Sequence, residues 1–484
     1  MIARPLSLFL LGGILFFFAL GNHSLQNSTE PRVAGIAMEM HLTGDWVTPK
    51  LNRQPFLEKP PLSVWLDATA IRVFDASPWS VRLASALAGL LSLLLLYAML
   101  RRFGRPRRIA WAAAFLLATT ASFWSNVRQV GEDALLTLGV TTALLAFWQA
   151  TGSRYPHDSK IGPWLLFTLG IVISTLSKGV LGLALPGVVI FAYLVSQSIL
   201  EKRLVLADWL RPAMFTLLAW VPLAVWLGFL YRDGGAQSVR EVLWTNSVGR
   251  FSGSFEEAGH YEPFYYYLAR LPEAFLPWNL LVYAGLWHFR KQLLSNRYLL
   301  FFSLWLVAQF TLLTLSSSKR VVYLMSLAPA AAVMAAEYLA VLDERLRAMA
   351  QRSSLAATVL RHETALTTMA MLLIVATYLV SAWWLAPRAD QQLSFVPLMQ
   401  QAQALGRQGR HIVLFQPSER LAGASVFYSQ SLVDSIDNDA QLNAFLSASA
   451  ENIAILESRS EPAPPLKIID RFTIGERVYY FVSR

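Results

Sequence analysis

Long apolar runs recur along the whole chain and restrict the folds that it can adopt. A helix needs about 17–25 mostly apolar residues to cross a bilayer. Because the bilayer core offers backbone groups no hydrogen-bond partner, spanning segments are helices or closed barrels. A barrel would show short segments of alternating hydrophobicity, whereas these runs are continuous. We therefore predict an α-helical polytopic membrane protein with about eleven transmembrane helices, over residues 5–21, 79–100, 109–126, 134–151, 162–177, 179–199, 212–230, 269–289, 298–315, 320–340 and 365–386.

Charge and cysteine content agree with this class. Only 15% of the residues are charged and 55% are hydrophobic, which is unusual for a soluble chain of this length. The chain has no cysteine, so disulfides and thiolate metal sites are excluded. Polar residues follow the first apolar run and no A-x-A cleavage site is present, so we predict a retained anchor over residues 5–21.

The net charge of +10 has a topological explanation. Membrane proteins concentrate basic residues in their cytoplasmic loops. With a cytoplasmic N-terminus, every second loop of this chain is basic, most clearly the RRFGRPRR run at residues 101–108. We therefore predict a bacterial inner-membrane protein with its N-terminus in the cytoplasm, and nucleic-acid binding is not needed to explain the charge.

The sequence divides into two predicted domains. Residues 1–387 form the transmembrane domain, with external loops over 22–78 and 231–268. From residue 388 the composition shifts to alternating strands and helices, which predicts a small periplasmic α/β domain over 388–484. Its expected strands are 411–415, 452–456, 466–469 and 478–482, and its expected helices are 395–405 and 439–449. The domain carries no nucleotide loop, so we expect a role in shape or acceptor contact.

Charged residues on the outer side of the predicted membrane are the most informative feature. Ionisable groups near a membrane are costly, so they indicate function. Basic residues are disfavoured in outer loops, and a phosphate carried on a lipid would explain their presence, since Arg and Lys are its usual ligands. The charges are Glu30, Arg32, Glu58, Lys59, Arg128, Glu132, Asp133, Lys178, Arg250, His260, Lys319 and Arg320.

Each of the main candidates also has a purely structural interpretation. Glu30 opens an amphipathic helical segment and could cap it, although Glu is not a favoured cap. Lys59 precedes Pro60-Pro61, whose rigid extended backbone would aim it at one point, but it could also extend to the headgroups. Asp133 could act only by stabilising the start of a helix through the helix dipole. Lys178 sits in a tight turn between two apolar runs, which favours function.

Several segments resemble a known family of membrane enzymes. EPRVAGIAMEMHLTGDWVTPKLN and PFLEKPPLSVW are similar to the first external loop of the lipid A aminoarabinose transferases and of bacterial relatives that resemble protein O-mannosyltransferases. The resemblance continues through VRQVGEDALLTL, LSKGVLGLALPGVVI, HYEPFYYYLARLPEAFLPWNLL and SSSKRVVYLMSLAPA. These segments lie in order over roughly residues 5–340, and it is their joint occurrence that is specific.

The resemblance implies a GT-C glycosyltransferase that takes a sugar from a polyprenyl (undecaprenyl) phosphate donor. By position, the catalytic acids fall on Glu30 and Asp133. The donor-phosphate ligands would by position include Lys59, Lys178 and Tyr323, and we add Arg250 and Lys319 because they are basic and lie on the outer side. The other cavity residues that we expect from their chemistry and outer location are Arg32, Glu58, Arg128, Glu132, His260 and Tyr261. There is one departure, because many relatives carry Asp-Glu where this chain has Thr29-Glu30.

The expected partners are the lipid-linked donor, membrane lipids and a lipid, glycan or protein acceptor. Glu30 would accept the acceptor's proton, and basic residues would stabilise the leaving phosphate. If the acceptor is itself a phosphate, Glu30 would instead orient it or bind a cation. No cofactor is assigned, and a divalent cation stays open. The alternatives are a transporter or flippase of lipid-linked sugars, which usually shows internal repeats, and an O-antigen-type ligase or polymerase.

Overall fold

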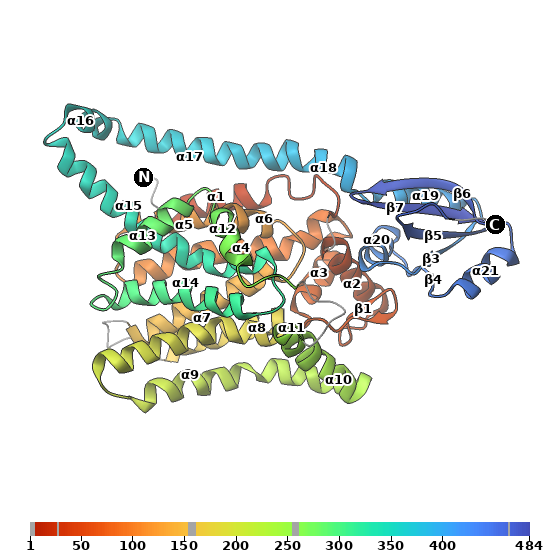
Figure 1. The fold of residues 1–484 in the computed structure, drawn as a ribbon, viewed down its shortest axis with the longest axis horizontal. Helices are drawn as coiled ribbons and strands as arrows, with labels where there is room; N and C mark the ends of the chain where they lie inside the picture. The colour runs from red at the N-terminus through yellow and green to blue at the C-terminus, as the bar shows by residue number, and fades with distance from the viewer. Residues whose placement is uncertain (1–4, 27–28, 153–160, 254–260, 463–464) are drawn as a thin grey trace.

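The computed structural model describes residues 5–26, 29–152, 161–253, 261–462 and 465–484. A bundle of long helices fills one part of the molecule, and a small domain with a β-sheet lies beyond one end of it (Figure 1). The predicted class, a helical membrane domain with a small C-terminal α/β domain, is confirmed. The bundle contains α1 (Pro5–Phe17), α4 (Pro78–Arg102), α5 (Arg107–Ala118), α7 (Asp133–Gly152), α8 (Ile161–Glu201), α9 (Leu206–Ala219), α10 (Val221–Arg240), α13 (Asn279–Phe289), α14 (Arg297–Leu315), α15 (Ala328–Ala350) and α17 (Glu363–Val380).

Within the described ranges, eight helical segments are long and apolar enough to cross a membrane. The other three predicted spans are shorter or broken. Residues 5–21 form only the thirteen-residue α1. Residues 109–126 divide into α5 and α6 (Ala121–Asn126), and residues 269–289 into α12 (Tyr266–Ala274) and α13. Pro277 interrupts the last of these because proline cannot continue a helix.

The predicted hairpin over 162–199 is present as a reversal inside α8. The backbone leaves the helical region at Lys178 (φ −143°, ψ 23°) and Gly179 (φ 56°, ψ −129°). The positive φ at Gly179 is a conformation that side chains with a Cβ rarely adopt. The first half of α8 packs closely on α7, where a Cβ on Gly139 would lie 2.5 Å from Ser174 N. This packing holds Lys178 beside the start of α7.

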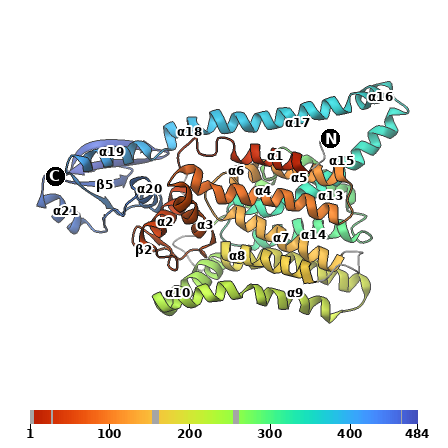
Figure 2. The same cartoon turned by 180° about the vertical axis from the view of Figure 1, so that it is seen from behind.

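The first external loop forms a compact layer at one end of the bundle. It contains α2 (Thr29–Thr43), the short strands β1 (Lys50–Leu51) and β2 (Gln54–Pro55), and α3 (Leu62–Phe74). The amphipathic segment predicted to start at Glu30 is α2, which ends just before Gly44 at φ 70°. Figures 1 and 2 show this layer between the bundle and the C-terminal domain.

The C-terminal domain is built on a five-stranded sheet. Its elements are α19 (Val396–Arg407), β3 (His411–Phe415), α20 (Glu419–Ser429), β4 (Ser435–Ile436), α21 (Asp439–Ala448), β5 (Asn452–Ser458), β6 (Lys467–Ile474) and β7 (Arg477–Ser483), and the strand order is β4-β3-β5-β7-β6. Strands β4, β3 and β5 are parallel, and β7 runs antiparallel to β5 and β6. The four predicted strands are confirmed, whereas α20 and β4 were not predicted.

One helix connects the two parts along the flank of the bundle. After α16 (Ser354–Arg361), α17 runs beside the other helices and has no fully buried residue. The π-helix η4 (Ser381–Leu385) and α18 (Ala386–Leu393) continue towards the sheet (Figure 2). Asp390 of α18 accepts hydrogen bonds from the Ser24 amide and hydroxyl, which fixes the loop before α2.

Candidate active site

Four charged residues from three separate segments meet at the end of the bundle nearest α2 and α3. The Nζ of Lys59 lies 2.6 Å from Glu132 Oε1, and the Nζ of Lys178 lies 3.4 Å from the same oxygen. Lys178 also pairs with Asp133. Glu132 and Lys178 are almost completely buried. The sequence named all four residues as candidates, and the structure brings them together.

Local backbone features hold each of these side chains. Lys59 precedes Pro60 and Pro61, and α3 begins directly after them. Asp133 is the first residue of α7, where a carboxylate is favoured by the helix dipole. Lys178 is presented by the reversal inside α8. Short sequence features therefore determine the directions of both lysines.

The charges of the two lysines control the ionisation of Glu132. Burial alone would raise the pKa of this carboxyl, because it penalises the charged form. The charges of Lys59 and Lys178 outweigh burial and hold the Glu132 pKa well below its usual value. Glu132 is therefore a carboxylate at neutral pH, and it balances two cations in a buried site.

A cavity of about 340 Å³ lies beside this cluster, and its lining combines charged and apolar side chains. The charged part of the lining is Glu58, Lys59 and Lys178, with the Tyr323 ring centroid 4.3 Å from the Lys178 Nζ. The apolar part comes from α8, α11 (Arg250–Ser252) and α14, namely Val180, Leu181, Ala184, Phe251 and Leu312. The cavity therefore suits a ligand with an anionic head and an apolar chain.

A π-helix that the sequence did not predict forms another wall of the cavity. The segment η1 (Glu241–Gly249) supplies Asn246, Ser247 and Val248. Asn246 Nδ2 donates to the Leu57 carbonyl at 3.3 Å, which connects η1 to the segment that carries Lys59. Long π-helices are rare and often mark functional sites, but their hydrophobic pattern does not distinguish them from α-helices.

Glu30 lies outside the cavity lining and is held by Arg82. Its carboxylate is 1% exposed and accepts hydrogen bonds from Arg82 Nε at 2.8 Å and Arg82 Nη2 at 2.9 Å. The backbone amides of Gln26 and Val130 also donate to it. Burial would raise the Glu30 pKa, but Arg82 and these bonds lower it overall. These contacts favour a structural role over that of a general base.

Arg82 is a charged residue that sequence reasoning missed, although it lies inside a predicted span. It is fully buried near the start of α4 and also donates to the carbonyls of Leu20, His23 and Ser24. An arginine within an apolar run was the available signal, because such residues almost always have a partner. Its partner comes from another loop, which the linear sequence does not identify.

Asp67 is a second residue that the sequence analysis omitted. It lies on α3, is 2% exposed, and one of its carboxylate oxygens has no hydrogen-bond partner among the described residues. Burial and the nearby Glu132 carboxylate raise the Asp67 pKa well above its usual value. Asp67 is therefore a neutral acid next to the charged cluster.

Arg32 connects the cavity to the C-terminal domain. Its Nη1 lies 2.7 Å from Glu419 Oε2 and 3.8 Å from Glu58 Oε2. The side chain is 12% exposed, and its guanidinium lies over the Phe56 ring. Glu58 in turn lies 3.9 Å from the Lys59 Nζ. Arg32 therefore lies behind the cavity wall that Glu58 forms.

The remaining candidates have different surroundings. Arg128 is buried and donates to carbonyls at the end of α1, away from the cavity. Lys319 donates to the Ser316 and Glu262 carbonyls and does not line the cavity. Tyr261 forms an isolated bridge with Ser318, which does line it. The Arg250 side chain and all of His260 lie outside the described residues.

Thr29, at the position where the resemblance led us to expect an acid, contacts a basic residue. Its hydroxyl accepts a hydrogen bond of 3.2 Å from Arg320 Nη2. The Arg320 backbone is held by the Tyr267 hydroxyl, which contacts both its N–H and its carbonyl at 3.1 Å. The contact links α2 to the segment that follows α14.

As for a cation, the described parts of the chain contain no group of three or more metal-ligating side chains.

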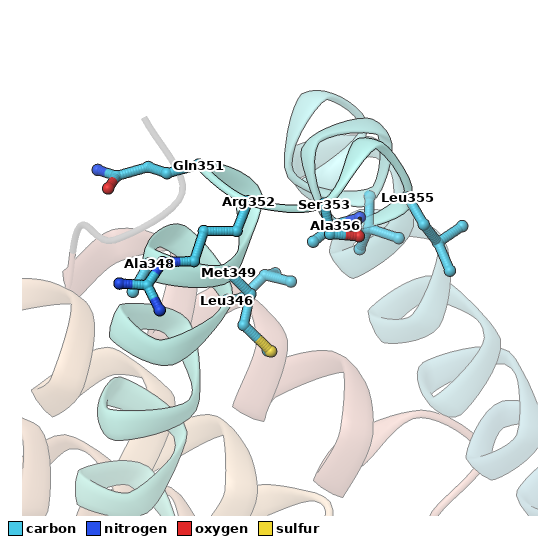
Figure 3. Close-up of a pocket in the computed structure, with 9 residues that line it drawn as sticks. Leu346, Ala348, Met349, Gln351, Arg352, Ser353, Leu355 and Ala356 are labelled. Carbon is cyan, nitrogen blue, oxygen red and sulfur yellow. Dashed lines mark hydrogen bonds between the residues drawn. The ribbon is translucent and has the colours of Figure 1, made fainter.

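The largest cavity described is far from this cluster. It measures about 590 Å³ and lies between the end of α15 and α16 (Figure 3). Figure 1 places α16 at the end of the bundle opposite the C-terminal domain. Its lining is mainly apolar with Arg352 and Gln351, and it contains no carboxylate. Size alone therefore does not identify the candidate site.

The overall fold is similar to that of two solved membrane proteins. It superposes on ArnT from Cupriavidus metallidurans bound to undecaprenyl phosphate with a TM-score of 0.74, covering 98% of this chain and 97% of that one at 20% identity. The archaeal oligosaccharyltransferase AglB from Archaeoglobus fulgidus matches at a TM-score of 0.56 and 15% identity, with coverage of 94% and 69%. At these identities the likeness establishes the fold.

Sequence comparisons identify particular relatives. Residues 58–226 match the family model of dolichyl-phosphate-mannose-protein mannosyltransferases. The undecaprenyl phosphate-α-4-amino-4-deoxy-L-arabinose arabinosyl transferase of Pseudomonas aeruginosa (strain LESB58) is 32% identical over 316 residues, which is 65% of this chain and 55% of the relative. The Aeromonas hydrophila enzyme of the same name is 30% identical, covering 68% and 59%. The chain thus spans little more than half of these relatives, and the resemblance seen in its loops is confirmed.

Proposed function

We propose that this chain is a membrane glycosyltransferase that moves a sugar from an undecaprenyl-phosphate donor to an anionic acceptor such as lipid A. The observation that carries the proposal is the mixed lining of the cavity. Lys59 and Lys178 supply cations, and Val180, Leu181 and Leu312 supply apolar surface in the same cavity. A polyprenyl phosphate combines these two chemistries in one molecule.

The two lysines would bind the donor phosphate and stabilise it as a leaving group. When the bond between the sugar's anomeric carbon and the phosphate oxygen breaks, the electron pair stays on that oxygen. Buried cations that are already in position stabilise such charge at little reorganisation cost. Lys178 is held by Asp133 and Lys59 by Glu132, so both ammonium groups are fixed before the donor arrives.

The acids of the site favour an acceptor that is already ionised. A hydroxyl acceptor needs a base to take its proton. Glu132 is paired with both lysines, Asp133 with Lys178, and Glu30 with Arg82. Thr29 replaces the further acid of many relatives. A phosphate oxygen can attack the anomeric carbon without losing a proton, so we propose a lipid phosphate as the acceptor.

The proposed cellular setting follows from the basic loops. The chain is a multi-pass membrane protein, and we propose that it lies in a bacterial inner membrane with its N-terminus in the cytoplasm. The cavity and the C-terminal domain would then face the periplasm, where a lipid acceptor in the outer leaflet has access. A flippase of the same donor stays as the second candidate, because it would bind the same two-ended lipid.

Reconstitution distinguishes these functions. The full chain in proteoliposomes is given undecaprenyl-phosphate aminoarabinose and lipid A, and the lipids are analysed by mass spectrometry. A lipid A species with one added sugar, together with free undecaprenyl phosphate, supports transfer. Movement of intact donor between leaflets without a new product supports the flippase. As an in vivo counterpart, a deletion strain should lack one sugar on an extracted lipid rather than accumulate donor.

A further inference from the structure

Among the described residues, two ion pairs connect the C-terminal domain to the first external loop, and one of them lies next to the cavity wall. Arg53 pairs with Asp434, and both side chains are more than half exposed. Arg32 pairs with Glu419 at 2.7 Å, and Arg32 is the buried residue behind Glu58. The two pairs cross the same interface. Comparing variants of the two pairs therefore distinguishes a contact that only holds the domain in place from one that also affects the active site.

The surroundings of Glu419 show that it is a fixed part of the C-terminal domain. Its neighbours in sequence, Ser418 and Arg420, both contact Glu457 of β5. Glu457 also pairs with Arg477 of β7. The start of α20, which carries Glu419, is therefore attached to two central strands of the domain.

The helices that carry this ion pair cross at backbone contact. A Cβ placed on Gly35 of α2 would lie 2.4 Å from the Gly423 Cα, and one on Gly423 would lie 2.3 Å from the Pro31 carbonyl oxygen. Figures 1 and 2 show α2 between α3 and α20. Because no side chain separates the two backbones, a shift of α20 is transmitted directly to the turn of α2 that carries Arg32.

We propose that Glu419 is a positioning residue of the active site, which keeps Arg32 from closing on Glu58. Arg32 lies nearer to Glu419, at 2.7 Å, than to Glu58, at 3.8 Å. If Glu419 loses its charge, Arg32 moves into full contact with Glu58 and draws that carboxylate out of the cavity wall. The C-terminal domain is then a working part of the transferase rather than only a cover. This inference rests on the proposed function.

The test compares Glu419→Gln with Asp434→Asn in the full-length chain. Glu419→Gln leaves both cavity lysines in place, so binding of undecaprenyl phosphate should stay within about twofold of wild type. Because Glu58 is drawn out of the cavity wall, kcat should fall about tenfold. Asp434→Asn changes neither by more than about twofold. A merely structural role would lower lipid binding, thermal stability and turnover together, and it would affect both variants.

A double-mutant cycle isolates the coupling to Glu58. In a Glu58→Gln background, Glu419→Gln should reduce kcat by less than about twofold, because the carboxylate that Arg32 would contact is already absent. Additive effects overturn the proposal, as does a Glu419→Gln variant with wild-type kcat. Should Glu58→Gln abolish turnover, a cryo-EM structure of Glu419→Gln decides the question. A shortened Arg32–Glu58 contact supports the proposal and an unchanged one overturns it. A wild-type chain that neither binds undecaprenyl phosphate nor transfers sugar would instead overturn the proposed function.

Discussion

Glu30 and Arg82 form a buried ion pair with two hydrogen bonds, 2.8 Å and 2.9 Å long, at the point where α2 meets α4. Arg82 is fully buried and Glu30 is 1% exposed. The pair joins the first external loop to the bundle and lies outside the cavity lining. We therefore interpret Glu30 as a structural residue that holds α2 on α4, and not as a catalytic base.

Glu30→Gln should destabilise the fold, because it leaves the Arg82 charge buried without its partner. Breaking such a pair from one side costs about 3–5 kcal/mol. Thermal unfolding in detergent measures the loss. The double variant Glu30→Gln/Arg82→Met should recover part of it, since no unpaired charge is left. A Glu30→Gln protein with wild-type stability and no transfer would restore the catalytic role.

Lys178→Met should weaken donor binding, because Lys178 is one of the two lysines that line the cavity. We expect undecaprenyl phosphate affinity to fall about tenfold or more, as for the loss of a buried charge-assisted bond. Lys50→Met is the matched control. Lys50 lies in the same outer layer but pairs with Asp45, on a surface outside the cavity lining. Equal losses in the two variants would contradict the assignment.

Replacing Glu132 and Asp67 by the corresponding amides should have effects of different size. Glu132 is ionised and paired with two lysines, so Glu132→Gln should lower both stability and turnover. Asp67 is kept neutral by burial and by Glu132, which raise its pKa. Asp67→Asn resembles its native protonated form and should cost less than about 1 kcal/mol. Unfolding and transfer assays on both variants test this contrast, which is refuted if Asp67→Asn is the more damaging change.

His23 should make the protein sensitive to acid. Burial, followed by the charge of Arg82, lowers the His23 pKa from 6.5 to about 4. The unfolded state therefore binds a proton between these values and the folded state does not, so stability falls as pH drops from 6.5 towards 4. His23→Gln should remove this part of the pH dependence, on the order of 1–2 kcal/mol after solvent screening. Unfolding temperatures from pH 7 to pH 4 measure the difference, and identical slopes would contradict it.

Gly423→Ala should separate α20 from α2, because its Cβ would lie 2.3 Å from the Pro31 carbonyl oxygen and 2.6 Å from the Arg32 Cα. Neither backbone can move aside without displacing a helix. Limited proteolysis should therefore cut between the bundle and the C-terminal domain faster than in wild type. Gly406→Ala in the same domain meets no atom within 4 Å and should behave as wild type. A Gly423→Ala protein that resists proteolysis would show that the interface tolerates the methyl group.

Much of the fold and part of the site follow from short sequence features. The Pro60-Pro61 pair, the acids before α7 and the glycine after Lys178 each determine a local direction. Those directions bring Lys59, Asp133 and Lys178 together. Contacts between distant segments could not be predicted in this way. Arg82 pairs with Glu30, which lies fifty-two positions earlier in the sequence. No pattern in either segment predicts this pairing.

The C-terminal domain shows the same limit. Its strands follow from short apolar runs, but Gly423 has no special backbone angle that would mark it. Its importance comes from Gly35, in another domain, which approaches at backbone distance. The π-helix over Glu241–Gly249 was also missed, because it lies in the segment 231–268 that we predicted as an external loop.

The most direct test of the central claim is a cryo-EM structure of the full chain with undecaprenyl phosphate bound. We predict that the phosphate oxygens of the bound lipid lie within hydrogen-bond distance of the Lys59 and Lys178 ammonium groups. The first isoprene units should lie against Val180, Leu181 and Leu312. A phosphate bound elsewhere, with both lysines still paired only to Glu132 and Asp133, would contradict it.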